Sequence, residues 1–158
     1  MKEENEKLTR SIQLMRSFRN VQKNLICLEQ QTAARNGLSM PQYAILMTLG
    51  KCKEMTQKKV GEVTFLPKST LSQAVDGLVR DGFLDRRQVE DNRREMQLAL
   101  TEKGVALVEA VHQQEGGSHQ RFQEAVESLS DEQYEKLLEI HQHISAHLDV
   151  RELEEQRK

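Results

Sequence analysis

The sequence predicts a mainly helical protein with one small β-hairpin, and three observations support this fold class. Residues 5–34 contain no glycine or proline, and their apolar residues recur at helical intervals. Serine or threonine stands at an N-cap position ahead of several later apolar runs. Only the segment that follows Gly82 alternates apolar and polar residues in the manner of strands. We therefore expect long helices at both ends of the chain and a small lobe of helices and a hairpin between them.

The first two helices are marked by how they end and begin. The segment "NGLS" ends the long first helix, because asparagine and glycine favour the conformation that closes a helix. Ser39, Pro41 and Gln42 then form a capping-box arrangement, with proline in the first turn. A second helix is predicted to continue through "YAILMTLGK".

The third and fourth helices form a helix-turn-helix pattern. Thr56 caps the short segment "TQKKVGEV", "FLP" interrupts it, and "KSTLSQAVDGLVRDG" forms the next helix, which Gly82 closes. In such a motif, the start of the second helix enters the major groove of DNA. Hydroxyl and amide groups can reach base edges or phosphates there, although Ser and Thr could instead only cap the helix. The outward residues at this end are Lys68, Ser69, Thr70, Ser72 and Gln73.

The predicted hairpin is basic. "FLDRRQV" and "EMQLALT" read as two strands, with the turn residues Asp91 and Asn92 between them. Surface arginines are common and could pair with neighbouring acids, but a basic hairpin directly after a helix-turn-helix favours a wing that contacts DNA. The arginines in or beside the hairpin are Arg86, Arg87, Arg93 and Arg94.

The remaining chain is predicted to form helices with an apolar side. Thr101 caps a fifth helix, which Gly116 and Gly117 end or kink, and "SDEQ" at 130–133 is a second capping box. The last helix is expected to run to about Arg157. Its apolar stripe comprises Leu137, Leu138, His141, Ile144 and Leu148.

Charge is distributed unevenly along a chain whose net charge is −2. Residues 1–103 hold 18 basic and 13 acidic residues, whereas residues 104–158 hold 5 and 12. Because phosphate contacts depend on local charge, the first part can bind DNA while the acidic last part lies away from it. The sequence has no stretch long enough to span a membrane and no apolar signal segment at residues 1–10, so we expect a cytoplasmic protein with no membrane partner.

The stretch from Thr56 to Gly104 resembles the MarR family of bacterial winged-helix regulators. Its most specific element is Asp-x-Arg followed by Leu-Thr-x-x-Gly, present here as Asp91-Asn92-Arg93-Arg94 and Leu100-Thr101-Glu102-Lys103-Gly104. "GLVRDGFLDR" resembles the end of the family's recognition helix and its first wing strand. Counting back from Thr101 without gaps puts Arg94 at the family's arginine position, so either Arg93 or Arg94 could be the contact at the wing tip. Gln73 stands where many relatives carry arginine.

The resemblance implies a homodimeric repressor or activator, with a repressor favoured. It would bind a pseudo-palindromic double-stranded DNA operator. The resemblance also implies release by a small lipophilic or phenolic effector. The expected parts are a dimerisation helix at 1–36, a winged helix-turn-helix lobe at 37–103, and dimerisation helices at 104–158. Apolar stripes at both ends of the chain fit pairing with a second copy.

Several other functions are weaker hypotheses. Cys27 could act as a redox sensor, but an inert buried thiol is the favoured interpretation for Cys27 and Cys52. Methionines such as Met47 could line a ligand pocket or simply belong to the core. The histidines lack the spacing of a zinc site, no catalytic motif is present, and no metal, cofactor or enzymatic activity is expected. A winged-helix adaptor that binds proteins instead of DNA is the remaining alternative.

Overall fold

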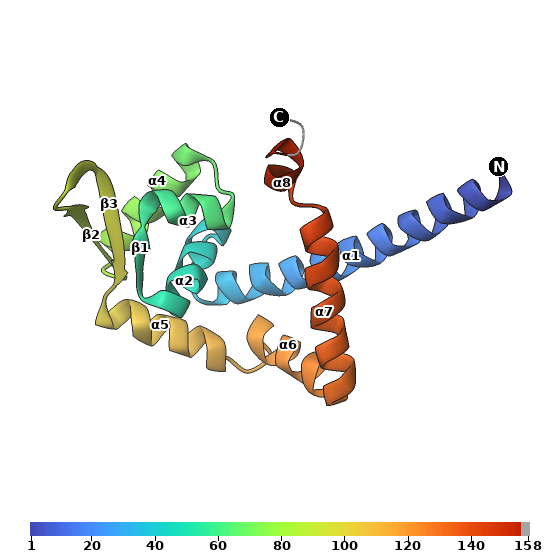
Figure 1. Cartoon of the computed structure of the whole chain (residues 1–158). Helices are drawn as coiled ribbons and strands as arrows, with labels where there is room; N and C mark the ends of the chain where they lie inside the picture. The colour runs from blue at the N-terminus through green and yellow to red at the C-terminus, as the bar shows by residue number, and fades with distance from the viewer. Residues whose placement is uncertain (156–158) are drawn as a thin grey trace. The chain divides into compact units, whose positions relative to one another are not determined.

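The computed structural model describes residues 1–155 and confirms the mainly helical fold with a small sheet (Figure 1). The helices are α1 (Lys2–Arg35), α2 (Met40–Cys52), α3 (Gln57–Thr64), α4 (Lys68–Arg80), α5 (Glu102–Gln113), α6 (Ser118–Glu127), α7 (Asp131–His147) and α8 (Val150–Glu155). The strands are β1 (Glu54–Thr56), β2 (Leu84–Val89) and β3 (Asn92–Leu100). Residues Met1–Gln120 form one compact unit, and a second unit begins at Arg121.

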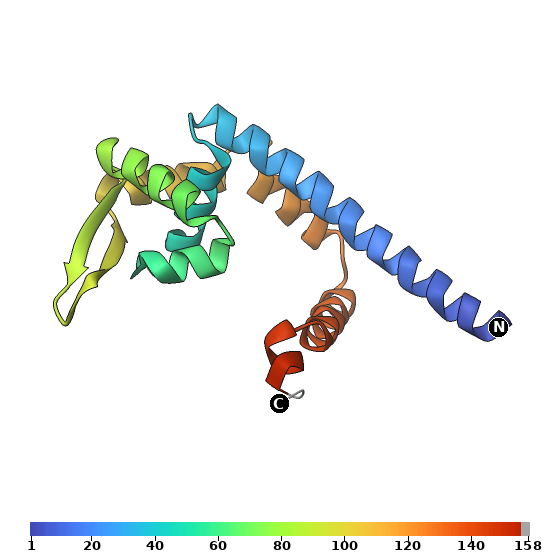
Figure 2. The same ribbon diagram turned by 90° about the horizontal axis from the view of Figure 1, so that it is seen from above.

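The core of the first unit lies around α2, which contacts α3, α4 and α5 (Figure 2). Ile45, Leu46 and Leu49 of α2 are completely buried. They are buried together with Leu78 of α4 and Leu98 of β3, so one apolar cluster joins the helix-turn-helix to the sheet. Burial of this apolar surface is the main force that holds the lobe together.

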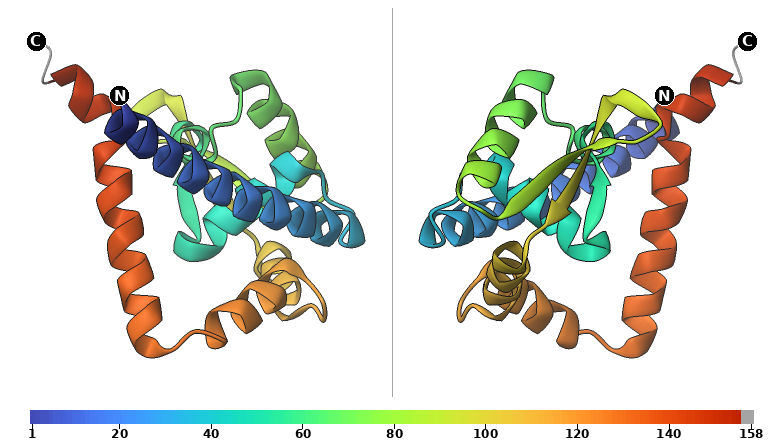
Figure 3. Two further views of the ribbon diagram at one scale, coloured as in Figure 1. Left: turned by 90° about the vertical axis from the view of Figure 1, so that its right-hand side faces the viewer. Right: turned by 90° about the vertical axis from the view of Figure 1, so that its left-hand side faces the viewer.

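The sheet has three antiparallel strands in the order β1-β3-β2 (Figure 3). The hairpin of β2 and β3 is the predicted wing, and its register pairs Arg86 with Leu98. Strand β1 was not predicted from the sequence. It has only three residues and pairs with β3 through Met55 and Leu98, so its existence depends on a partner about forty residues away rather than on a local pattern.

Side-chain caps begin four helices at the predicted residues. Ser39 and Ser130 form complete capping boxes, and Thr56 and Thr101 each accept a hydrogen bond from the backbone N–H three residues later. Each cap satisfies a donor that has no partner within the helix, which fixes where these helices start.

The fifth helix ends ahead of the glycine pair, at Gln113, but the rest of the C-terminal part differs from the prediction in two details. A separate helix, α6, follows the glycine pair at Gly116 and Gly117, and the sequence had given no clear sign of it. The last helix was expected to be continuous to about Arg157, but α7 ends at His147 and α8 begins at Val150. The end predicted at Arg157 lies outside the described residues.

Long apolar side chains lie exposed on helices of both units. In α1, only Thr32 and Ala33 are buried, and the helix extends well beyond the lobe (Figure 1). Its exposed apolar residues include Leu8, Ile12, Leu14, Met15, Val21 and Ile26. Those of α7 are Tyr134, Leu137, Leu138 and Ile140. No helix within residues 1–155 has the length and apolar character needed to cross a membrane.

The turn between α3 and α4 contains an energetically unfavourable residue. Phe65 adopts a left-handed conformation with φ of 56°, and its side chain is 90% exposed. Both features favour glycine, because a Cβ in this conformation costs about 1–2 kcal/mol. We expect Phe65→Gly to stabilise the chain by roughly 0.5–1 kcal/mol after the added flexibility of the unfolded glycine is subtracted.

Urea denaturation at a fixed protein concentration measures this effect. Phe65→Ala is the control, since it removes the ring but keeps the left-handed Cβ, and it should gain less than Phe65→Gly. A glycine variant that is less stable than the natural chain would show that the phenylalanine ring stabilises the fold.

Candidate nucleic-acid interface

The helix-turn-helix is positioned by apolar contacts along the facing sides of α3 and α4. Val60 of α3 and Val75 of α4 are completely buried. Gly61 allows close approach, because a Cβ at this residue would lie 3.1 Å from Cδ2 of Leu71. The pair is therefore a rigid unit, and the start of α4 is held on the outside of the lobe.

The polar residues at the start of α4 are not used as caps. The N-cap of α4 is Pro67, whose side chain makes no capping hydrogen bond. The first backbone bond of the helix is donated by the N–H of Leu71 to the carbonyl of Pro67, at 2.9 Å. The amide groups of residues 68–70 lie ahead of it, in the position where helix N-termini bind anions. The interpretation that Ser69 and Thr70 merely cap the helix is thus excluded.

Most predicted residues of α4 are accessible. Lys68, Ser69 and Gln73 are exposed, and Thr70 and Ser72 are half-buried. None of these side chains is hydrogen-bonded to another residue in the described part of the chain. Their polar groups are free to bind an external partner.

Arg86 has a partner within the fold. Its Nη1 donates to Oδ1 of Asp76 at 2.7 Å, and this ion pair joins strand β2 to α4. The strand register explains why the side chain of Arg86 points toward α4. Arg86 lies opposite Leu98, on the face of the sheet that is turned toward the helices. Asp76 was not among the predicted site residues, although it is an acidic residue at an outward position of the recognition helix. Arg86 therefore orients the wing relative to the helix.

The other arginines of the wing differ in their surroundings. Arg87 lies opposite Gln97, and its Nη2 is 3.9 Å from Oε2 of Glu54, a long and exposed contact that contributes little. Neither Arg93 nor Arg94 forms an ion pair with any other residue among 1–155.

Arg94 lies on the same side of the hairpin as the helix-turn-helix. It borders an open hollow of about 610 Å³ together with Lys68 and Ser72 of α4 and residues of α3. Arg93 does not border this hollow. The Oδ1 atom of Asn92 accepts the backbone N–H of Arg94 at 3.1 Å, which fixes the turn at the tip, and Asp91 is exposed there.

The hollow carries a local excess of basic groups. Lys58, Lys68 and Arg94 line it together with Glu62 and Glu95. Glu62 is also 3.5 Å from the Nζ atom of Lys59, which partly neutralises it. A confined basic surface therefore lies between the two helices and the wing, as the charge distribution of the sequence predicts.

The Leu-Thr-x-x-Gly segment locks the base of the wing to the end of α4. The hydroxyl of Thr101 donates to the carbonyl of Gly82 at 2.6 Å, and the Nζ atom of Lys103 donates to the carbonyl of Asp81 at 2.7 Å. The same ammonium lies 4.6 Å from the centre of the Phe83 ring. These contacts at the base of the wing thus help to set the position of Arg94 near its tip.

The cysteine prediction was wrong in one respect. Cys27 and Cys52 are both exposed rather than buried. Cys27 lies in α1 ahead of the buried residues Thr32 and Ala33, and Cys52 is the last residue of α2, where the core ends. Within residues 1–155, no group of three or more His, Cys, Asp and Glu side chains is placed to hold a metal ion.

The fold and sequence match known regulators. The MarR family model matches residues 36–95. The HTH-type transcriptional repressor YetL of Bacillus subtilis strain 168 is 27% identical over 132 residues, which cover 82% of this chain and 77% of that protein.

Two solved structures have similar folds. AbfR of Staphylococcus epidermidis gives a TM-score of 0.74 at 22% identity, covering 92% of this chain and 98% of that one. AbfR has also been solved bound to DNA, in reduced and overoxidized forms. NadR in complex with 4-hydroxyphenylacetate gives a TM-score of 0.72 at 16% identity, covering 85% of this chain and 91% of that one.

YetL is a transcriptional repressor, and the family match falls on the helix-turn-helix and most of the wing described above. Residues 36–95 therefore match the MarR family of transcriptional regulators, and the chain resembles the transcriptional repressor YetL over most of its length.

Proposed function

We propose that this regulator is a homodimeric repressor that binds a pseudo-palindromic operator in the cytoplasm and is released by a small effector. Each α4 would enter a major groove, and each wing would reach the flanking minor groove. The observation that carries the proposal is the basic hollow, which brings Lys68 and Ser72 of the recognition helix to the same side as Arg94 of the wing. A surface with a cation at each end suits the phosphate backbone of DNA, which runs between the adjacent major and minor grooves.

The residues of this surface have different proposed roles. Lys68 and the free amides of α4 suit phosphate oxygens, whereas Gln73 can pair with adenine in the major groove. Hydroxyl groups can donate hydrogen bonds to phosphate oxygens or to base edges, and α4 offers those of Ser69, Thr70 and Ser72. Arg87, Asp91 and Arg93 lie on or near the other face of the wing or at its tip, so we assign them a smaller share of the binding energy.

Selection of bound fragments from a random-sequence DNA pool tests this function. An enriched inverted repeat with half-sites about one helical turn, or roughly 34 Å, apart supports both the target and the twofold symmetry. Binding should weaken steeply with added salt, because phosphate contacts release counterions. Failure to enrich any sequence would instead support an adaptor that binds proteins.

The dimer rests on the exposed apolar residues of α1 and α7, since exposed patches of this kind mark association surfaces. We expect Leu137→Glu to weaken dimerisation by at least about 2 kcal/mol, because a carboxylate would have to be buried. Sedimentation equilibrium measures the dimer fraction, and circular dichroism verifies that α7 still folds.

Ala146→Glu is the matched control for this substitution. Residue 146 is nine positions from Leu137, so at 3.6 residues per turn it lies on the opposite side of α7. The control should leave the dimer intact. A Leu137→Glu variant that sediments like the natural chain would contradict the proposed interface.

Repression and release are supported by the relatives. YetL is a repressor, and NadR binds 4-hydroxyphenylacetate. An effector acts only if it binds the free form more tightly than the DNA-bound form. A titration with 4-hydroxyphenylacetate should therefore raise the melting temperature of the free chain and lower its operator affinity together. A rise in melting temperature without loss of operator binding would argue against this mode of release.

Release by thiol oxidation is a second candidate, favoured by the exposure of Cys27. A sensor thiol needs solvent access, which Cys27 has. If this mechanism operates, peroxide should release the natural chain from its operator but not Cys27→Ser. Equal release of both proteins would exclude Cys27 as the sensor.

A further inference from the structure

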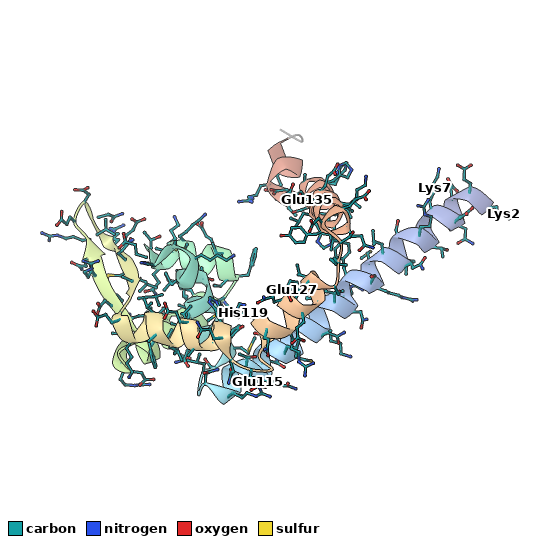
Figure 4. All side chains as sticks on the ribbon, turned by 90° about the horizontal axis from the view of Figure 1, so that it is seen from below. Lys2, Lys7, Glu115, His119, Glu127 and Glu135 are labelled. Atoms are coloured by element: carbon teal, nitrogen blue, oxygen red, sulfur yellow. The ribbon has the colours of Figure 1, made fainter. Side chains whose placement is uncertain are left out.

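Three potential metal ligands from different helices meet at one place in the first unit. The Nε2 atom of His119, in α6, lies 3.3 Å from the Sδ atom of Met47, in α2. The ring of His112, in α5, meets the ring of His119 edge to face, with 4.3 Å between the ring centres. Figure 4 labels His119 near the start of α6. The cluster thus comprises two imidazoles and one thioether.

The fold holds His119 in this position through its neighbour. Ser118 is only 3% exposed, its N–H donates to Oγ1 of Thr32 at 2.9 Å, and its hydroxyl shares a hydrogen bond of 2.8 Å with that of Tyr43. Since Tyr43 and Met47 both belong to α2, the first turn of α6 is fixed against the helix that supplies the sulfur. The cluster is therefore preorganised, and its members all lie within residues 1–120.

The ligand types select a particular class of ion. Thioether sulfur is a soft ligand that binds Cu(I) and contributes little to sites for zinc or for hard divalent ions. His112 is exposed, so an ion can enter from its side.

We propose that Met47, His112 and His119 form a binding site for a soft monovalent metal ion, Cu(I) in the cell and Ag(I) as its redox-inert analogue. The Sδ atom of Met47 and Nε2 of His119 supply two ligands, and the imidazole of His112 supplies the third after a small rotation of its exposed ring. Binding replaces the contact between His119 and Met47 with two metal–ligand bonds and involves no electron transfer.

The test uses the full chain with both cysteines replaced by serine, because exposed thiols bind Cu(I) themselves. This protein is titrated with Cu(I) under anaerobic conditions against a coloured Cu(I) chelator. We expect one equivalent to be withheld from the chelator. Loss of even an outer-shell partner of a metal ligand costs about 10- to 100-fold in affinity, so Met47→Leu and His119→Gln should each cost at least as much.

His143→Gln is the matched control. His143 and His147 also form a contact between rings, with 4.6 Å between their centres, but they lie in α7, outside the Met47–His112–His119 cluster. This substitution should leave Cu(I) binding unchanged. Addition of Ag(I) should also shift the NMR signal of the Met47 methyl group, a readout that reports ligation directly.

Three results would overturn the proposal: complete transfer of Cu(I) to the chelator, equal affinity in Met47→Leu, or a loss of binding in His143→Gln as large as in His119→Gln. Melting curves of each variant distinguish loss of a ligand from loss of the fold. Since no DNA is present in this experiment, its outcome is independent of the proposed operator binding.

Discussion

Gly104→Ala is expected to destabilise the chain by about 3 kcal/mol, through overpacking against backbone rather than against a side chain. A Cβ at Gly104 would collide with the carbonyl oxygen of Phe83. That oxygen also accepts the N–H of Thr101 at 3.1 Å, so it cannot move away without loss of a hydrogen bond. Relief would require separating the start of α5 from the base of the wing.

Urea denaturation with circular dichroism measures the loss, and Gly77→Ala is the control. Gly77 is also buried in a helix, but the nearest atom to its added Cβ is Nε2 of Gln42, the end of a flexible side chain. The control should change stability by less than about 1 kcal/mol, since alanine also favours the helix. Equal stability of Gly104→Ala and the natural chain would show that the segment after the wing is loosely packed.

The same contacts explain why the Leu-Thr-x-x-Gly motif could be identified from the sequence alone. Thr101 and Gly104 are close in sequence, and their roles are local, as a cap and as a close backbone approach. Ser39, Thr56 and Ser130 were predicted correctly for the same reason. Capping depends on residues within one helical turn, which a sequence displays directly.

Features that depend on distant partners could not be predicted in this way. Strand β1 forms because Met55 pairs with Leu98 of β3. The side chain of Arg86 is oriented by its ion pair with Asp76 of α4. The exposure of Cys27 depends on how far the lobe covers α1, which no local pattern encodes. Burial and pairing across elements are therefore the parts of the candidate interface that required coordinates.

The choice between Arg93 and Arg94 is a further example. Sequence counting left both open, because counting back from Thr101 without gaps puts Arg94, rather than Arg93, at the family's arginine position. Their side chains differ in surroundings, and only Arg94 borders the hollow with Lys68.

Arg94→Ala is expected to lower operator affinity by about 1–3 kcal/mol, whereas Arg93→Ala should cost clearly less. Fluorescence anisotropy over a salt series measures both. If Arg94 binds phosphate, the slope of log affinity against log salt should also fall by about one, and a contact with a base edge should leave the slope nearly unchanged. Both arginines are exposed and lack ion pairs among the described residues, so neither substitution should alter the melting temperature. A larger loss in Arg93→Ala would mean that the opposite face of the wing meets the DNA, and the hollow between Lys68 and Arg94 would then have no part in binding.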